Sequence, residues 1–102
     1  MRNTLILFLF TCFQVSFAQT KVSGHVFDVN GEPVSFANVL FKDSSEGTTT
    51  NENGRFYLES DETWDTLIVS FIGYHTLELP LEKKVMFDLK LTLEEEAAEL
   101  DA

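Results

Sequence analysis

The feature that most constrains the fold is a series of short strand patterns that fills the chain from Lys21 to Leu93. Branched, aromatic and aliphatic residues recur in these patterns, and turn residues keep each one short. The segments are residues 21–29, 37–41, 48–50, 56–58, 66–74, 75–82 and 85–93. No helical period of useful length precedes the acidic C-terminal residues, so the pattern predicts an all-β sandwich of seven strands, at roughly 8–12-residue spacing.

Alternation within the segments predicts which side chains face the core. In residues 85–93 we expect Val85, Phe87, Leu89, Leu91 and Leu93 to face inward and Met86, Asp88, Lys90 and Thr92 to face outward. Residues 66–74 are nearly all apolar, which is typical of a strand covered on both faces. Residues 48–58 predict a hairpin that reverses at Asn53 and Gly54. The core should draw on six Phe residues: Phe27, Phe36, Phe41, Phe56, Phe71 and Phe87.

Residues 1–18 predict a secretory signal peptide, with a basic start at Arg2, an apolar run, and small residues at Ser16 and Ala18. A membrane anchor is the alternative, but the run is shorter than the about 20 apolar residues of a span. Cys12 would suit a lipoprotein signal, but Thr11 is larger than the residue such signals prefer, so we interpret Cys12 as part of the removed segment. The mature chain then has no cysteine for a disulfide, nucleophile or metal site, which fits the bacterial envelope.

The charge of the chain argues against several partners. Removal of residues 1–18 leaves six basic against seventeen acidic side chains, a net charge of −11. Nucleic acid and anionic lipid both need clustered Lys and Arg, so we expect neither as a partner, and no direct membrane insertion after signal cleavage. Five of the seventeen acidic residues crowd into residues 94–102, which we interpret as a linker outside a domain at residues 19–93.

Four motifs occur in order: G-x-V-x-D-x-x-G-x-P, A-N-V, G-T-x-T-x-x-x-G-x-F and S-x-x-G-Y. Together they resemble the carboxypeptidase-regulatory-like domain, a transthyretin-like (prealbumin-like) sandwich, over about residues 21–93. The resemblance implies a small Greek-key-type β-sandwich. The matching positions are Gly24, Val26, Asp28, Gly31, Pro33, Ala37, Asn38, Val39, Gly47, Thr48, Thr50, Gly54, Phe56, Ser70, Gly73 and Tyr74.

Such domains commonly stand behind a signal peptide at the N-terminus of TonB-dependent, SusC-like receptors and related outer-membrane proteins of gram-negative bacteria. The resemblance therefore implies a non-catalytic accessory or interaction domain, in the periplasm or outer membrane, whose partners are the plug and barrel domains of the same chain or other envelope proteins. Because those segments are not part of this sequence, we expect a truncated chain. A free-standing carbohydrate-binding or adhesive module is the alternative. An enzyme is a third reading, and the family's catalysis lies in other domains.

Most matched residues have structural roles open to them, in turns and in the core. These are Gly24, Asp28, Gly31, Pro33, Ala37, Asn38, Gly47, Thr48, Gly54, Phe56, Gly73 and Tyr74. Gly31, Gly47 and Gly54 are expected to supply positive φ or close approach at turns. Asp28 and Asn38 are expected to cap turns. Tyr74 is expected to bury its ring and bond its hydroxyl to the backbone, as a sandwich-corner tyrosine does.

We predict no catalytic residue, no cofactor and no metal site. Asp28, Asn30 and Glu32, like residues 51–53, alternate as calcium ligands would, but neither group has enough carboxylates. His25 and His75 lack a third zinc ligand. Trp64 is the one candidate for ligand contact, because an exposed indole stacks on sugars, although such a residue more often plugs the end of a sandwich core.

Overall fold

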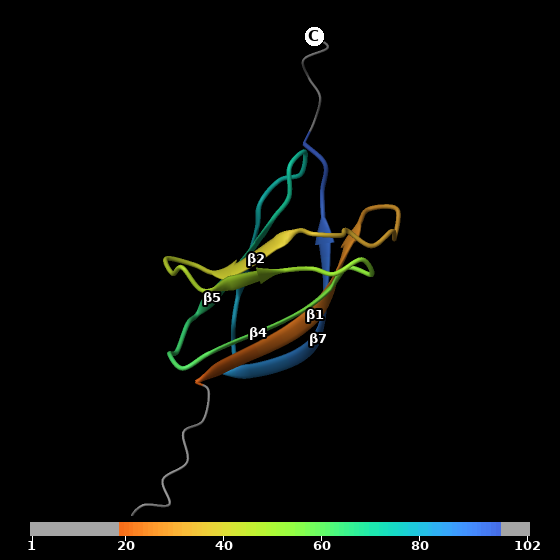
Figure 1. The fold of residues 1–102 in the computed structure, drawn as a ribbon. Coiled ribbons are helices and arrows are strands. Elements are labelled where there is room, and N and C mark those ends of the chain that lie inside the picture. Colours follow the sequence, from red (N-terminus) through yellow and green to blue (C-terminus); the bar gives the residue numbers. More distant parts are fainter. Residues whose placement is uncertain (1–18, 97–102) are drawn as a thin grey trace, which may run out of the picture.

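The structure, a computed structural model, describes residues 19–96, which form seven strands in two facing sheets (Figure 1). The three-stranded sheet has the order β4-β1-β7 and the four-stranded sheet the order β3-β2-β5-β6. The strands are β1 (Thr20–Asp28), β2 (Asn38–Phe41), β3 (Gly47–Thr49), β4 (Arg55–Ser60), β5 (Thr66–Ser70), β6 (Leu77–Pro80) and β7 (Val85–Leu93). The predicted all-β sandwich of seven strands is confirmed. Within residues 19–96 there is no helix long and apolar enough to span a bilayer.

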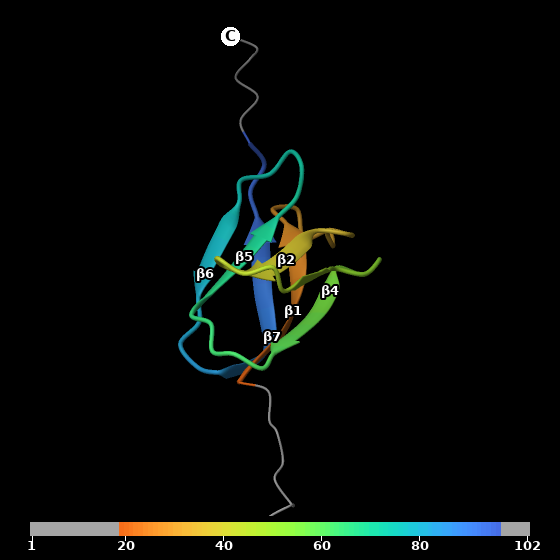
Figure 2. The ribbon, with the colours of Figure 1, turned by 60° about the vertical axis from the view of Figure 1, so that its left-hand side comes forward.

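The centre of the three-stranded sheet is β1, which pairs antiparallel with β4 and parallel with β7. Because β1 and β7 run in the same direction, the described chain begins at one end of the sandwich and finishes at the other (Figures 1 and 2). Residues 94–96, predicted as linker, continue past β7 and pair with the turn after β5: Tyr74 bridges Glu95, and the Glu96 N–H donates to the Gly73 carbonyl at 3.0 Å. The predicted signal peptide and residues 97–102 lie outside the described residues.

Aliphatic side chains from both sheets supply most of the core. Its buried members are Val22, Val26, Val34, Ala37, Val39, Phe41, Phe56, Leu58, Leu67, Val69, Leu91 and Leu93. Of the six Phe residues expected there, only Phe41 and Phe56 are buried, and Phe27 and Phe71 are half-buried. The prediction is wrong for Phe36 and Phe87, which are 61% and 53% exposed.

A β-bulge in β7 explains where Phe87 goes. Val22 pairs with Met86 but Gly24 pairs with Leu89, so two residues of β7 oppose one of β1. The bulge includes Asp88 at φ 59°, and its extra residue shifts the alternation by one position. The expectation for Leu89, Leu91 and Leu93 holds. It is wrong for the residues before the bulge, because Met86 packs against the core while Val85 and Phe87 are exposed.

Two further expectations are wrong. Residues 48–58 do not form a hairpin, because β3 pairs with β2 in one sheet and β4 pairs with β1 in the other. The reversal exists, closed by the Asn51 N–H donating to the Arg55 carbonyl at 2.9 Å, but it joins the two sheets. In residues 66–74 the strand ends at Ser70, and Ile72 is 87% exposed. Ile68 is half-buried rather than covered, since within residues 19–96 no layer packs over that face of the four-stranded sheet.

Candidate functional site

Two turns at one end of the sandwich use the same local chemistry. The Asp28 Oδ1 accepts hydrogen bonds from the Asn30 and Glu32 N–H groups at 2.8 and 2.9 Å. The Asn51 Oδ1 accepts from the Asn53 and Arg55 N–H groups at 2.8 and 3.0 Å. Short polar side chains capture nearby backbone donors in this way, so two of the side chains weighed as calcium ligands, Asp28 and Asn51, cap turns here. Residues 19–96 contain no group of three or more His, Cys, Asp or Glu side chains that could hold a metal ion.

Gly54 shows why a glycine stands in the second turn. Its φ is +79°, and an added Cβ would lie 2.7 Å from the Val26 carbonyl oxygen and 3.1 Å from the Pro33 Cβ. Gly31 and Gly73 also have positive φ, whereas Gly47 needs close approach: a Cβ there would meet the Val39 carbonyl oxygen at 2.7 Å.

Thr50 joins the two turn regions, a role that the sequence reasoning missed. Its buried hydroxyl donates to the Val34 carbonyl at 2.7 Å and accepts from the Ala37 N–H at 2.9 Å. Thr50 is the second Thr of the G-T-x-T motif, and that matched position was the available signal for this role. Phe36, between these two partners, has φ 60° and an exposed ring. The matched residues Asn38 and Thr48 lie in the paired strands β2 and β3, with Asn38 exposed and Thr48 half-buried.

Trp64 lies at the opposite end, held by Thr20 and Ser60. Its indole N–H donates to the Ser60 Oγ at 2.9 Å, and its backbone N–H donates to the Thr20 Oγ1 at 3.1 Å. Its ring stacks on Phe41 with 6.0 Å between centroids and an interplanar angle of 11°. This half-buried ring closes the end of the core. Ligand contact through Trp64 stays a prediction.

Tyr74 is half-buried and lies 6.0 Å from Phe71 between ring centroids. Burial, together with the carboxylates of Asp28 and Glu95, raises the pKa of Tyr74 above its ordinary value of 10.0. Within the described chain its hydroxyl forms no hydrogen bond to the backbone. The two histidines belong to different regions: His25 lies on β1, and His75 is exposed in the segment between β5 and β6.

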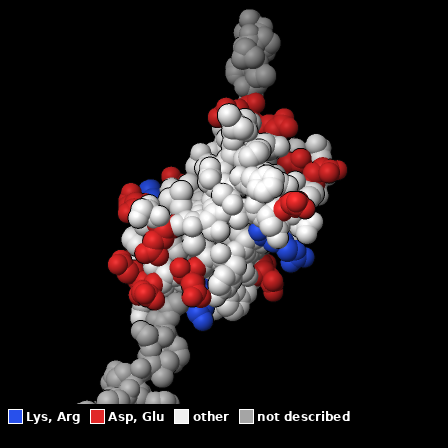
Figure 3. Space-filling model, in the orientation of Figure 1, with Lys and Arg blue, Asp and Glu red and all other residues white. Residues whose placement is uncertain are grey.

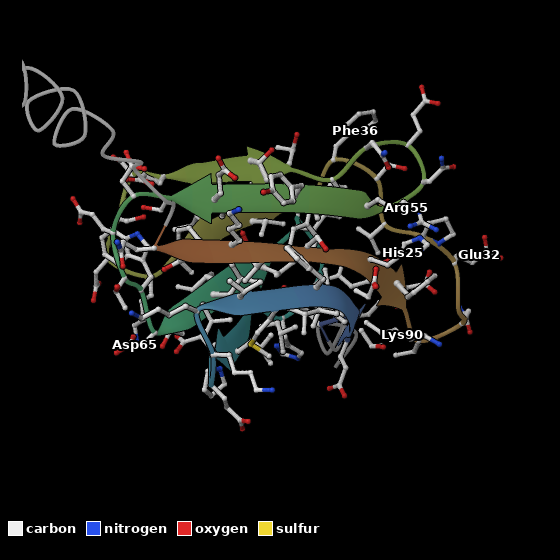
Figure 4. All side chains as sticks on the ribbon, turned by 90° about the horizontal axis from the view of Figure 1, so that it is seen from below. His25, Glu32, Phe36, Arg55, Asp65 and Lys90 are labelled. Atoms are coloured by element: carbon white, nitrogen blue, oxygen red, sulfur yellow. The ribbon has the colours of Figure 1, made fainter. Side chains whose placement is uncertain are left out.

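The structure also assembles a group of residues that the sequence reasoning did not connect. Strand register pairs His25 with Arg55 on one side and with Lys90 on the other. We call these three side chains the basic row. Figure 4 shows them side by side at one end of the three-stranded sheet, with Asp65 at the opposite end. The Lys90 Nζ lies 5.4 Å from the centroid of the Phe27 ring, and the His25 and Phe27 rings are 4.2 Å apart.

A depression of about 440 Å³ opens beside the basic row. It is lined by Ser23, Gly24, His25, Phe27, Arg55, Phe56, Asp88, Leu89 and Lys90. The part of the chain that the structure describes contains one ion pair, between Lys42 and Glu78, so Arg55 and Lys90 are not neutralised there. In the view of Figure 3, Asp and Glu side chains lie mainly toward the edges of the molecule, around a broad area without charged side chains.

Exposed aromatic side chains accompany the basic row. Tyr57 lies on β4 opposite Ser23 and is 51% exposed, and its hydroxyl donates to the Glu59 Oε1 at 2.6 Å. That hydrogen bond is the main cause of a raised Tyr57 pKa. Phe87 projects from the same face because its neighbour Met86 faces the core. The outer face of the three-stranded sheet therefore presents cations, hydrogen-bond donors and aromatic rings, which are groups that can bind a ligand.

Comparison with known proteins identifies the family. Residues 22–102 match the model of the CarboxypepD_reg-like domain. The chain is 40% identical over 86 residues to the TonB-dependent receptor SusC of Bacteroides thetaiotaomicron, covering 84% of the chain and 8% of the receptor. It is 33% identical over 92 residues to a TonB-dependent receptor of Formosa agariphila, covering 88% of the chain and 9% of that receptor.

Solved structures show the same fold at low identity. A type II cohesin–X-dockerin complex from Acetivibrio cellulolyticus matches with a TM-score of 0.61 and 17% identity, over 74% of this chain and 58% of that one. A 3-chlorocatechol 1,2-dioxygenase from Rhodococcus opacus matches with a TM-score of 0.56 and 14% identity, over 82% and 62%. These likenesses concern the fold alone. The family match over residues 22–102 and the two receptor relatives agree, and the chain belongs to the CarboxypepD_reg-like domain family.

Proposed function

We propose that this chain is a non-catalytic accessory domain at the N-terminus of an exported outer-membrane protein, either a TonB-dependent receptor or a related β-barrel protein. The observation that carries the proposal is the match of 84% and 88% of the chain to two TonB-dependent receptors, of which it spans only 8% and 9%. A domain that is so small a part of a receptor acts alongside the rest of it. Transport itself would belong to the plug and barrel domains.

The topology supports a domain placed in series with others. The chain enters at Thr20 and leaves after Leu93 at the opposite end of the parallel β1–β7 pair. Nine residues of strand, at about 3.3 Å each, separate entry from exit by roughly 30 Å. Such a domain would hold its N-terminal end about that distance from the domain that follows it, and it would present its sheet faces to the periplasm.

Two experiments test the proposal. The DNA downstream of codon 102 should encode a plug and a β-barrel, and a stop codon at that point would remove the main support. In the parent gene, replacement of residues 22–93 by a flexible linker should reduce nutrient import while the receptor remains in the outer membrane. Insertion of the matching segment of the Bacteroides receptor should restore import. Unchanged import with the linker would contradict an accessory role.

A further inference from the structure

We propose that the outer face of the three-stranded sheet binds an extended acidic segment of a partner protein, whose carboxylates are recognised by Arg55 and Lys90 of the basic row. Between them lies His25, whose Nε2 is already hydrogen-bonded to the Asn53 carbonyl. This inference deepens the proposed function by naming the chemistry of the partner, and it rests on that function for the partner being an envelope protein.

The geometry of the basic row is set by strand register. Arg55, His25 and Lys90 occupy directly paired positions on β4, β1 and β7, so their side chains share one face of the sheet. Neighbouring strands lie about 4.8 Å apart, which sets three basic groups in a line across the strands. The small residues Ser23 and Gly24 leave the depression open beside that line.

Arg55 and Lys90 lie two strand spacings apart, roughly 10 Å, on either side of His25, and neither forms an ion pair within residues 19–96. The net charge of the mature chain is −11, but charges beyond about 8 Å are largely screened at physiological ionic strength. The one acidic side chain that lines the depression is Asp88, set against Arg55 and Lys90. A carboxylate brought by a partner would form charge-assisted hydrogen bonds with these two cations, and Arg makes such bonds in bidentate form.

The rest of the face favours a peptide segment over other anions. Exposed Tyr57 and Phe87 add the aromatic residues that are enriched, with Arg, at protein interfaces. Two strands of about 30 Å and one of about 20 Å present roughly 400 Å², below the about 800 Å² per partner of a standard interface between folded proteins. An extended segment suits that area. The Phe27 ring already contacts His25 and Lys90, so the aromatic rings that a partner meets first are Tyr57 and Phe87.

The test measures binding of a fluorescent octapeptide, containing six Asp or Glu residues with one Phe and one Leu, to the full 102-residue chain by fluorescence anisotropy. The control peptide carries Asn and Gln in place of the acids. The double variant Arg55→Gln/Lys90→Gln should weaken binding at least roughly tenfold, the loss of a charge-assisted hydrogen bond. The matched variant Lys42→Gln/Lys83→Gln removes the same charge elsewhere and should change binding less than about twofold.

Asp88→Asn should tighten binding, because it removes the one carboxylate of the depression while Asn tolerates the positive φ of this position. A misfolded variant could not produce that gain. Equal losses in both double variants, no binding by the folded wild-type chain, equal affinity for the amide peptide, or preferential displacement by polygalacturonate would each overturn the inference. Import by the parent receptor is measured separately, so failure here leaves the accessory role standing.

Discussion

The outer faces of the two sheets differ although the same core lies behind both. On the four-stranded sheet the one charged pair is compensated, since Lys42 and Glu78 lie 3.2 Å apart. A depression of about 300 Å³ there is lined by uncharged residues: Asn38, Leu40, Ser44, Ser45, Gly47, Thr48 and Thr49. On the three-stranded sheet the basic row has no such partner within residues 19–96 and stands among exposed aromatic rings. The difference between the two faces is what supports the proposal of partner binding on the three-stranded sheet.

The β7 bulge accounts for part of this difference. The four-stranded sheet keeps a continuous register in all its pairs, whereas the β1–β7 pair shifts between Val22 and Gly24. The shift sends Phe87 outward, and it is anchored by the Asp88 N–H donating to the Ser23 Oγ at 3.2 Å. Bulges near functional sites re-aim side chains in this manner.

The largest expected effect on stability is that of Gly24→Ala, which we compare with Gly47→Ala. In Gly24→Ala the new Cβ would lie 2.6 Å from the Leu89 carbonyl oxygen, and β1 is held by strands on both sides. We expect a loss of about 2–3 kcal/mol in the free energy of unfolding, measured with urea. Gly47→Ala meets the Val39 carbonyl oxygen at 2.7 Å, but β3 is a short edge strand that can shift, so about 1 kcal/mol is expected. Equal losses would contradict the tight packing of the three-stranded sheet.

The next comparison tests the bulge with two neighbouring residues. Met86→Ala should cost about 1–2 kcal/mol because the Met86 side chain packs against the core. Phe87→Ala should cost only about 0.5 kcal/mol because the ring is exposed. Uninterrupted alternation along β7 predicts the reverse order. A larger loss of stability in Phe87→Ala than in Met86→Ala, measured by urea unfolding, would therefore contradict the β7 bulge.

A smaller effect on stability distinguishes Lys42, which forms an ion pair, from Lys90 of the basic row. Lys42→Gln breaks an exposed ion pair and should lower stability by no more than about 0.5 kcal/mol. Lys90→Gln breaks no ion pair and loses only the exposed contact of its Nζ with the Phe27 ring, so a loss of about 0.5 kcal/mol that depends little on salt is expected. Thermal unfolding of both variants at low and high salt checks this, and a larger, salt-dependent loss on Lys90→Gln would mean that Lys90 is already paired with a carboxylate.

The smallest effect concerns Tyr57. Its hydroxyl bond to Glu59 favours the protonated phenol, so its pKa lies above the ordinary 10.0. The stability it contributes is therefore fully present below pH 10.0 and is lost as the pH rises through the raised folded pKa. Glu59→Gln should lower the phenolate midpoint seen by absorbance, with Tyr57→Phe identifying the signal. An unchanged midpoint would show that the hydrogen bond is absent in solution.

Local rules predicted most of the fold. Turn residues and period-two patterns predicted seven strands, because pleat and turn chemistry act over a few residues. The sequence reasoning failed where a distant strand decides the outcome. Nothing in the sequence near Phe87 indicates that the β1 register shifts between Val22 and Gly24, and nothing in residues 48–58 indicates that their two arms pair with different strands.

The basic row could not be predicted from the sequence for the same reason. His25, Arg55 and Lys90 are separated by thirty or more positions, and each alone is an ordinary surface residue. Only the register of β4, β1 and β7 brings them together. The hydroxyl of Thr50 likewise gains its two partners through the meeting of two turns.

The most direct test of the outer face of the three-stranded sheet as a recognition surface is an NMR titration of the isotope-labelled 102-residue chain with the acidic octapeptide. We expect chemical-shift changes centred on Ser23, His25, Arg55 and Lys90, with β2, β5 and Trp64 unchanged. Changes centred on the four-stranded sheet or on Trp64, or none at saturating peptide, would contradict the account.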